Sequence, residues 1–291
     1  MRVGGFGYGR GWRISAKALS LKKKLSMKPV QTDKAPFQGR RAVAVIGAGN
    51  MGGAVAIGLH RFAPEISLTV TTAHASTLEK YASLGIATSL DNAAAALSAD
   101  VVILGVKPWL VQGVIGQIAP FLSGKVLLSL AAGIPLAQMA EWLSGTGVAA
   151  AYTVIPNLAA EIGESMTFAS AILGEADALV LELFNRLGKT LLVDERRLQA
   201  GMMVASCGTA FALRYARAAM EGGIQLGLYP AEAQEAVYQT MKGAVDLAAA
   251  RGSHPEAEID RVTTPGGITI RGLNAMEAAG FTAAVIAGVK G

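Results

Sequence analysis

Short apolar runs separated by segments of helical pattern fill the first half of the chain. The runs cover residues 41–46, 67–72, 87–89, 100–106, 126–130 and 149–155. Runs that are rich in Val and Ile and apolar on both faces indicate strands buried in a parallel sheet. Helical segments between them, such as residues 78–84 and the Ala-rich stretch that follows Asp91 as N-cap, indicate βαβ units. The sequence therefore predicts an α/β domain with a doubly wound parallel sheet.

Beyond residue 172 the pattern becomes mainly helical. Helical patterns cover residues 175–187, 196–226, 230–251 and 270–289, with a short extended piece at 191–193. This change predicts two domains, residues 41–195 with the sheet and residues 196–291 as an all-α domain. Helices this rich in Ala and Leu would expose apolar stripes in isolation, so we expect them to pack between subunits.

Charge separates the start of the chain from the rest. The 291 residues carry a formal net charge of +5, but residues 1–41 carry +10 and residues 42–291 carry −5. A nucleic-acid-binding body is disfavoured, because the positive charge that phosphates require is missing from it. Residues 1–40 show no apolar core of a secretory signal. We favour an unstructured extension for them, and a transit peptide or a nucleic-acid or membrane arm remains open.

Composition narrows the class of protein further. Hydrophobic residues make up 52% of the chain and charged residues 16%, which excludes a disordered body. No uninterrupted apolar run reaches the roughly 18–20 residues of a membrane span, so buried strands explain the hydropathy better. Cys207 is the single cysteine, which excludes an internal disulfide framework and a multi-cysteine metal site. We therefore expect a reducing, cytoplasmic compartment.

A Gly-x-Gly-x-x-Gly pattern stands between the first predicted strand and a helical segment. Gly47 allows the tight turn, Gly49 lets the backbone approach a pyrophosphate, and Gly52 lets the helix pack close to the strand. Free N–H groups and the dipole of the helix start then attract phosphates. The pattern predicts dinucleotide binding, and a glycine-rich turn without a ligand is the alternative.

The end of the second predicted strand carries no acidic residue before Glu79. A site that prefers NAD usually presents Asp or Glu here, whereas small polar side chains tolerate a 2′-phosphate. Thr72, His74, Ser76 and Lys80 are candidate partners of that phosphate, with a plain surface loop as the alternative for His74. NADPH is therefore favoured as the cofactor, and NADH remains possible because no Arg is present.

Lys107 and Pro108 directly follow the buried run at residues 100–106. Ligands of a doubly wound sheet lie beyond the carboxyl ends of its strands, so Lys107 is predicted to lie at the site. Pro108 ends the strand and fixes the direction of the chain. A surface charge without a ligand is the alternative for Lys107. The next strand ends, at residues 131–133 and 156–157, are small or polar, as the floor of a cleft requires.

A Thr-Pro-Gly-Gly segment, residues 264–269, precedes the last helical stretch. Its N–H groups and hydroxyls can hold a small carboxylate, and a Thr-capped turn between helices is the alternative. The sequence offers no acid–base dyad, zinc spacing or Ser-His-Asp pattern, so no metal site is expected. Hydride transfer from a nicotinamide needs positioning more than a strong protein acid, because the cofactor carries the chemistry.

From residue 41 to its end the chain resembles the pyrroline-5-carboxylate reductase family. The resemblance rests on residues 45–52, 106–108, 131–133, 156–157 and 264–270, of which the last are the most specific. It implies a Rossmann-type domain followed by a helical dimerisation domain, in homodimers or higher homo-oligomers. The expected reaction is the NADPH-dependent reduction of L-1-pyrroline-5-carboxylate to L-proline, the last step of proline biosynthesis.

The resemblance also implies roles for single residues. The positions that match cofactor contacts are Asn50, Met51, Asn92, Val106, Lys107 and Pro108. Thr264, Gly266, Gly267 and Thr269 match the loop that holds the substrate, which the partner subunit usually supplies in the family. Gly266 and Gly267 are expected to hold the carboxylate. Thr269 is the expected catalytic residue, with its hydroxyl bonded to the imine nitrogen.

Two segments depart from the family's pattern. Residues 205–211 lack the usual Pro and Tyr, and residues 218–222 lack two acids at their usual places. Another NADP-linked imine or keto-acid reductase of the same build, or a non-catalytic dinucleotide sensor, therefore remains an alternative. The helical stretch after residue 196 has no Lys before Lys242, which disfavours hydroxyacid dehydrogenases. No nucleic-acid or membrane partner is expected.

Overall fold

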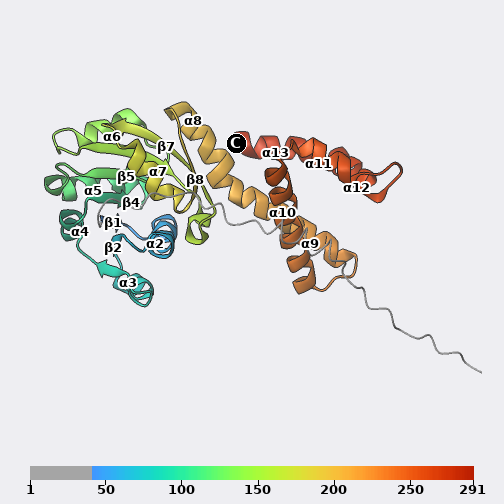
Figure 1. Ribbon diagram of the computed structural model, residues 1–291, viewed down its shortest axis with the longest axis horizontal. Coiled ribbons are helices and arrows are strands. Elements are labelled where there is room, and N and C mark those ends of the chain that lie inside the picture. The colour runs from blue at the N-terminus through green and yellow to red at the C-terminus, as the bar shows by residue number, and fades with distance from the viewer. Residues whose placement is uncertain (1–40) are drawn as a thin grey trace, which may run out of the picture. The chain divides into compact units, whose positions relative to one another are not determined.

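The computed structural model describes residues 41–291, and one sheet of eight strands forms the first half of this part (Figure 1). The strand order is β3-β2-β1-β4-β5-β6-β7-β8. The strands are β1 (Ala42–Ile46), β2 (Ser67–Thr71), β3 (Ala87–Ser89), β4 (Val101–Leu104), β5 (Val126–Ser129), β6 (Ala150–Ile155), β7 (Ser165–Leu173) and β8 (Gly188–Leu192). Strands β1 to β6 are parallel to one another, whereas β7 is antiparallel to β6 and β8 runs parallel to β7. The predicted α/β fold is confirmed, and the predictions for residues 1–40 lie outside the described residues.

Helices between the strands pack on both faces of the sheet. They are α2 (Asn50–Phe62), α3 (Ala75–Ala82), α4 (Asn92–Ser98), α5 (Val111–Ile118), α6 (Leu136–Leu143) and α7 (Asp177–Asn185), with short 3₁₀ turns η1 (Pro108–Leu110), η2 (Ala119–Phe121) and η3 (Leu158–Ile162). Asp91 caps α4 as predicted, because its carboxylate accepts hydrogen bonds from the amides of Ala93 and Ala94. The second predicted strand and the short helix after it are confirmed as β2 and α3.

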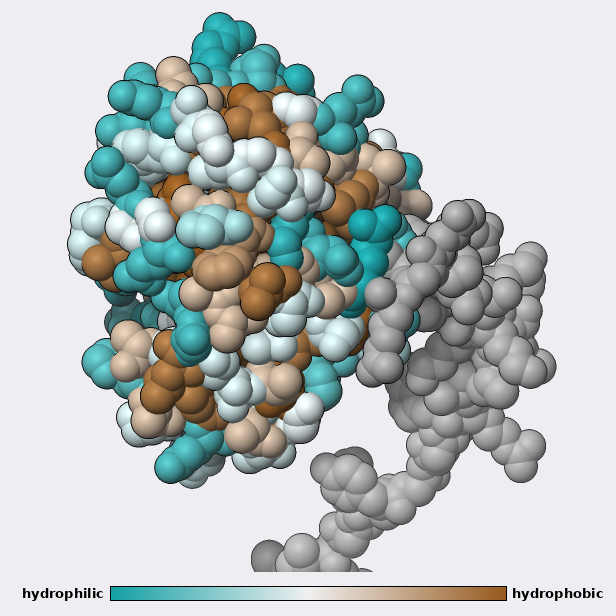
Figure 2. All heavy atoms as spheres, turned by 90° about the vertical axis from the view of Figure 1, so that its left-hand side faces the viewer, coloured by the Kyte–Doolittle hydropathy of each residue, from teal (hydrophilic) through white to brown (hydrophobic). Residues whose placement is uncertain are grey.

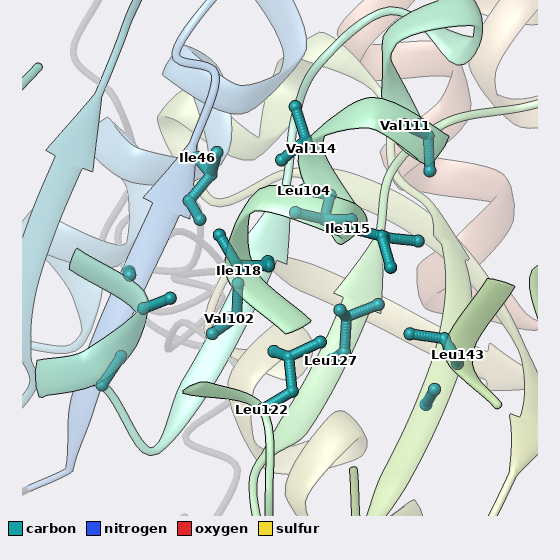
Figure 3. Packing of buried hydrophobic residues seen from close by; sticks show 14 of the residues in the cluster. Ile46, Val102, Leu104, Val111, Val114, Ile115, Ile118, Leu122, Leu127 and Leu143 are labelled. Carbon is teal, nitrogen blue, oxygen red and sulfur yellow. The ribbon is translucent and has the colours of Figure 1, made fainter. Parts of the chain in front are cut away.

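The main core lies between the sheet and helices α4, α5 and α6. Figure 3 shows side chains from one face of α5 pointing toward residues of β1, β4 and β5. The labelled members are Ile46, Val102, Leu104, Val111, Val114, Ile115, Ile118, Leu122, Leu127 and Leu143. A fully buried aliphatic side chain of this kind contributes about 1.5–3 kcal/mol relative to an exposed one. This packing holds the carboxyl ends of β1, β4 and β5 in one row.

Strand β7 was not predicted, because three of its buried side chains are polar. Ser165, Thr167 and Ser170 are all at most 5% exposed. The Ser165 hydroxyl accepts a hydrogen bond from the Asn157 amide and lies 3.2 Å from the Thr167 hydroxyl. Buried hydroxyls paired with one another do not produce the apolar alternation that marks a half-buried strand.

The second half of the described chain is helical, and a π-helical segment lies within one of the predicted stretches. Its elements are α8 (Glu195–Gly201), the π-helical segment η4 (Met202–Cys207), α9 (Gly208–Gln225), α10 (Pro230–Arg251), α11 (Pro255–Val262), α12 (Ile268–Ala278) and α13 (Phe281–Lys290). The helical stretch predicted over residues 196–226 is confirmed as α8, η4 and α9, and its π-helical segment was not predicted. The carbonyl of Ala205 accepts hydrogen bonds from the side chains of Asn157 (3.1 Å) and Thr209 (3.3 Å). Side chains inserted in this way widen a helical turn.

The last predicted helix, residues 270–289, is corrected. It is two helices, α12 and α13, bent by 52° at a break. Gly280 stands at that break with φ +83°, a conformation that favours glycine. Within residues 41–291 no single helix is long and apolar enough to cross a membrane, and the bent pair α12 and α13 passes that test by length and composition alone.

Large apolar side chains are exposed on the C-terminal helices. They include Leu213, Tyr215, Ile224, Tyr238, Val245, Ile268, Met276, Phe281, Val285 and Ile286. An apolar cavity of 640 Å³ opens between α9 and the α12–α13 pair, beside the edge-to-face rings of Tyr215 and Phe281. On the face drawn in Figure 2, by contrast, hydrophobic residues form small groups among hydrophilic ones. The exposed apolar side chains of the C-terminal helices therefore indicate a surface that binds a protein partner.

Candidate functional site

The point where the strand order reverses lies between β1 and β4. Strand β1 pairs with β2 on one side and β4 on the other, and all three are parallel. The amide of Gly105, directly after β4, donates to the carbonyl of Ile46 at the end of β1 (2.8 Å). The glycine loop, residues 47–52, and residues 105–108 therefore flank the crevice in which doubly wound proteins bind their ligands.

Two glycines of this loop allow close packing of the backbone, and the third leaves space beside it for a ligand. Gly47 has φ +91°, and a Cβ there would lie 2.4 Å from the Val106 side chain. A Cβ on Gly52 would lie 2.4 Å from the carbonyl oxygen of Gly47, so α2 can pack this close to β1 only with glycine. Gly49 is exposed, with nothing within 4 Å of an added Cβ. The loop fits the pyrophosphate of a dinucleotide at Gly49.

The start of α2 adds a favourable charge to this loop. Asn50 is exposed at the first position of the helix and Met51 is half-buried behind it. The first turn of α2 contains no acidic residue, so no carboxylate competes for its free N–H groups. Asn50 and Met51 thus stand in the first turn of α2, next to Gly49.

Thr71 ties the loop to the second strand. Its carbonyl accepts hydrogen bonds from the amides of Gly47 (3.0 Å) and Ala48 (2.9 Å). Its buried hydroxyl donates to the side-chain oxygen of Asn92 (2.7 Å), whose amide nitrogen donates to Gln117. Asn92 is therefore brought within two hydrogen bonds of the glycine loop, as expected for a residue near the cofactor.

The expected partners of the 2′-phosphate lie just after β2 and on the helix that follows it, α3. Thr72 is half-buried, and its hydroxyl accepts a long hydrogen bond from the His74 amide (3.4 Å). His74 caps α3, and Ser76 and Lys80 are exposed on that helix. The first turn of α3 carries no acidic residue. Polar and cationic groups without a carboxylate suit a phosphate better than a ribose hydroxyl.

Residues 106–108 lie against the glycine loop. Val106 packs beside Gly47, Lys107 is exposed with an extended backbone, and Pro108 opens η1. Lys107 therefore stands just beyond the carboxyl end of β4, with its side chain exposed. Trp109, which the sequence analysis did not single out, follows with 76% of its surface exposed.

A second cavity, of 310 Å³, lies at the carboxyl ends of β5 and β6. Ala132 and Gly133 line it from the sheet side, and Gln199 and Met202 line it from α8 and the π-helical segment. Asn157, by contrast, is buried and its amide donates to the Ala205 carbonyl. Of the two predicted strand ends, residues 131–133 contribute to a cavity, whereas Asn157 braces the π-helical segment.

The Thr-Pro-Gly-Gly segment forms an exposed turn before α12. The Gly267 amide donates to the Thr264 carbonyl (2.9 Å), and Gly266 has φ +70°. A Cβ on Gly267 would lie 2.4 Å from the Thr264 hydroxyl oxygen. Thr269 is exposed in the first turn of α12, which has no acidic residue. Free N–H groups and two hydroxyls can bind a small anion here.

Within residues 41–291 of one chain, this segment and the glycine loop do not meet. No hydrogen bond, ion pair or cavity of the described residues joins them. Helix α12 packs against α13, which in turn packs against α9 and the π-helical segment. The candidate cofactor and substrate residues therefore form two separate groups in a single chain.

Two further residues support these groups and were missed. Tyr81 on α3 is 2% exposed, and its hydroxyl donates to the Ala48 carbonyl in the glycine loop (2.9 Å). Glu258 on α11 accepts hydrogen bonds from Ser253, Arg251 and Arg261, just before the Thr-Pro-Gly-Gly segment. The inward position of Tyr81 on its helix could have indicated this residue from the sequence, whereas no local pattern indicated Glu258.

The described residues contain no group of three or more His, Cys, Asp or Glu side chains that could hold a metal ion. Two family models match the chain. One, described as pyrroline-5-carboxylate reductase dimerisation, matches residues 195–291. The other, described as NADP oxidoreductase coenzyme F420-dependent, matches residues 42–133, which include the glycine loop.

Pyrroline-5-carboxylate reductase 2 of Dictyostelium discoideum is 32% identical to this chain over 277 residues, covering 87% of this chain and 91% of the relative. The chain belongs to the pyrroline-5-carboxylate reductase family. The pyrroline-5-carboxylate reductase of Pisum sativum is 33% identical, covering 84% of this chain and 92% of its own. The structure of Plasmodium falciparum pyrroline carboxylate reductase with NADP bound has the same fold, with a TM-score of 0.78 and 23% identity, covering 86% of this chain and 94% of that one.

The two segments that depart from the pattern of the pyrroline-5-carboxylate reductase family lie in the region that the dimerisation model matches. Residues 205–211 form the end of the π-helical segment and the start of α9. Residues 218–222 lie within α9, where Met220 is buried against α10. Both departures from the family's pattern therefore fall on one helix of the dimerisation region and leave the glycine loop unchanged.

Proposed function

We propose that this chain reduces L-1-pyrroline-5-carboxylate to L-proline with NADPH, the last step of proline biosynthesis. The observation that carries the proposal is the pairing of two features in one member of this reductase family. The glycine loop is shaped for a pyrophosphate, and the Thr-Pro-Gly-Gly segment is shaped for a small anion. NADPH, when bound, supplies the hydride that reduces the C=N carbon.

Three groups of residues would hold the cofactor. The pyrophosphate lies against Gly47, Gly49 and Gly52 and the start of α2, with Asn50 and Met51 beside it. Val106, Lys107 and Pro108 border the same crevice, and Asn92 holds Thr71 behind it. Thr72, His74, Ser76 and Lys80 receive the 2′-phosphate. The absence of a carboxylate among these residues supports NADPH over NADH.

The Thr-Pro-Gly-Gly segment would hold the substrate. Gly266 and Gly267 border the carboxylate, with the Gly266 amide and the Thr264 hydroxyl as its donors, since the Gly267 amide donates to the Thr264 carbonyl. The Thr269 hydroxyl donates to the ring nitrogen of a neutral imine, or accepts from the N–H of the iminium form. Either bond fixes the C=N group in place, and the proton that completes the reaction reaches the nitrogen from solvent. Orientation and exclusion of water are the protein's contribution.

A homodimer, or a higher homo-oligomer built from it, completes the site in this proposal. The Thr-Pro-Gly-Gly segment of one protomer meets the glycine loop of its partner. The exposed apolar side chains of α9 to α13 and the 640 Å³ cavity among them support packing between copies. Residues 196–291 would then act as the dimerisation domain and residues 41–195 as the cofactor domain. A cytoplasmic location, consistent with the single Cys207, is part of the proposal.

Steady-state kinetics test the proposal. NADPH oxidation is followed with pyrroline-5-carboxylate, with other cyclic imines and with keto acids, and each is repeated with NADH. We expect the highest kcat/KM for pyrroline-5-carboxylate with NADPH. Turnover of another imine or a keto acid, but not of this substrate, would contradict the assignment. NADPH binding with no turnover on any substrate would indicate a sensor.

A further inference from the structure

The hydroxyl of Tyr81 lies directly beneath the glycine loop. Tyr81 sits on α3, far along the chain from that loop, and is 2% exposed. Its hydroxyl donates a hydrogen bond of 2.9 Å to the carbonyl of Ala48. A Cβ added to Gly53 would lie 2.3 Å from the same hydroxyl oxygen. The hydroxyl thus fills the space between the loop and the first turn of α2.

This bond fixes the orientation of one peptide group. The Ala48 carbonyl and the Gly49 N–H belong to the same planar unit, so holding the oxygen also holds the N–H. The Gly49 N–H in turn donates to the Gly47 carbonyl (2.9 Å). On its other side, the Ala48 amide donates to the Thr71 carbonyl (2.9 Å). Ala48 is therefore held at both ends, by Thr71 at its nitrogen and by Tyr81 at its oxygen.

Tyr81 also belongs to the helix that faces the other end of the cofactor. Ser76 and Lys80, the proposed partners of the 2′-phosphate, stand on α3, and the Lys80 ammonium lies 5.7 Å from the centre of the Tyr81 ring. Burial, and then the charge of Glu161, raise the pKa of Tyr81. Its hydroxyl therefore remains a donor throughout the physiological pH range.

We propose that Tyr81 is a positioning residue for dinucleotide binding, whose hydroxyl fixes the Ala48–Gly49 peptide and thereby the turn that presents the start of α2 to the pyrophosphate. This inference rests on the proposed use of NADPH and adds a residue to it. Without the hydroxyl, the Ala48 carbonyl loses a buried donor, and the peptide gains freedom that cofactor binding must remove.

The test compares two tyrosine variants by direct titration with NADPH and with adenosine 2′-monophosphate, which lacks the pyrophosphate. Tyr81→Phe keeps the ring and removes the hydroxyl. We expect its Kd and KM for NADPH to rise about 5- to 10-fold, with kcat unchanged. Binding of adenosine 2′-monophosphate stays unchanged, because α3 keeps its place. Tyr152→Phe is the matched control, since Tyr152 is 1% exposed and its hydroxyl bonds Asp177 and the Ala176 amide away from the loop.

A double substitution gives a second, independent readout. Gly53→Ala forces its Cβ against the Tyr81 hydroxyl, so we expect weaker NADPH binding in the wild-type background. In the Tyr81→Phe background the same change meets the ring carbon Cζ at 3.4 Å, an ordinary contact, and adds little further loss. Additive losses in the double variant would overturn the placement of the Tyr81 hydroxyl against the first turn of α2, on which the inference rests.

The outcomes separate this inference from the proposed function. Wild-type and Tyr81→Phe proteins with equal Kd for NADPH would overturn the inference. Equal weakening for NADPH and adenosine 2′-monophosphate would also overturn it, because that result indicates a displaced α3. A wild-type protein that binds NADPH and shows the Tyr81 effect, but does not reduce pyrroline-5-carboxylate, would overturn the proposed function alone. No NADPH binding by the wild-type protein would overturn both.

Discussion

A Cβ on Gly105, at the end of β4, would lie 2.8 Å from the Cα of Gly52 on α2. It would also lie 2.6 Å from the carbonyl oxygen of Gly47. Backbone atoms are the obstacles in both cases, so no side-chain rotation can relieve the contact. Glycine at position 105 is therefore part of the cofactor crevice, although it stands outside the Gly-x-Gly-x-x-Gly pattern.

Gly105→Ala is predicted to destabilise the protein and weaken cofactor binding together. Overpacking of this kind costs about 1–3 kcal/mol in the free energy of unfolding, measured by urea denaturation. Gly113→Ala is the control, because Gly113 lies on α5 with nothing within 4 Å of an added Cβ. It should be neutral or stabilise the protein by up to about 1 kcal/mol. Normal stability and NADPH binding in Gly105→Ala would show that the crevice can open without loss.

Gly49→Asp is predicted to fold normally and to lose NADPH binding. Gly49 is the exposed N-cap of α2 with an extended backbone, and Asp is a favoured N-cap residue, so stability should be kept or raised. Its carboxylate would stand where the pyrophosphate is proposed to bind, and like charges at this distance repel strongly. We expect at least a roughly 10-fold rise in Kd, measured by titration.

The neutral variant Gly49→Asn separates charge from size. It caps the helix equally well but adds no negative charge, so its Kd should rise much less than that of Gly49→Asp. Equal losses in the two variants would mean that steric fit, and not phosphate charge, decides binding at this position.

Glu258 is predicted to stabilise the connection between α10 and α11 in a pH-dependent way. The hydrogen bond from Ser253, followed by those from Arg251 and the charges of Arg251 and Arg261, lowers the pKa of its carboxyl. A carboxylate whose pKa is lowered in the folded state contributes full stability above its unfolded pKa of about 4.3. That contribution is lost as the pH falls through the lower, folded pKa.

Glu258→Gln should therefore be less stable than the wild-type protein at neutral pH, and the difference should shrink as the pH falls below about 4. Urea denaturation at several pH values measures it. Glu256→Gln on the same helix is the control, with an exposed side chain in the first turn of α11. A difference that stays constant with pH would show that the Glu258 charge is not involved.

Much of the first half could be predicted because its signals are local. Gly47, Gly49 and Gly52 stand at fixed spacing between a Val-rich run and a helix, and Asp91 is followed by an Ala-rich stretch. Each of these patterns depends on neighbours within a few residues, so each keeps its meaning without the rest of the chain. Helix α10, with Pro230 at its start, was predicted to its last residue for the same reason.

What could not be predicted depends on contacts between distant residues. The π-helical segment is held by the Asn157 side chain, which reaches the Ala205 carbonyl, and β7 contains the buried hydroxyl pair of Ser165 and Thr167. Tyr81 reads as an inward residue of a short helix, and its bond to Ala48 spans 33 positions. The separation of the Thr-Pro-Gly-Gly segment from the glycine loop within one chain was implied by the family resemblance alone, and no local pattern indicated it.

Mixed dimers test whether one site draws on two chains. Gly49→Asp blocks the proposed cofactor residues, and Thr269→Ala, expected to lower kcat/KM about 100-fold, blocks the proposed catalytic hydroxyl. Co-expressed with different tags, the two variants should recover about a quarter of the wild-type activity, because half of the dimers are mixed and one of their two sites is intact. Activity no higher than that of the separate variants would place both residue groups of a site in one chain.

The most direct test of the proposed reaction measures its product together with its cofactor. Purified protein is incubated with L-1-pyrroline-5-carboxylate and NADPH, and L-proline and oxidised cofactor are quantified in the same samples. We predict that L-proline appears mole for mole with the NADPH consumed, and faster than with NADH at equal concentration. NADPH consumption without L-proline, or no consumption with this substrate while another imine or keto acid is reduced, would contradict the account.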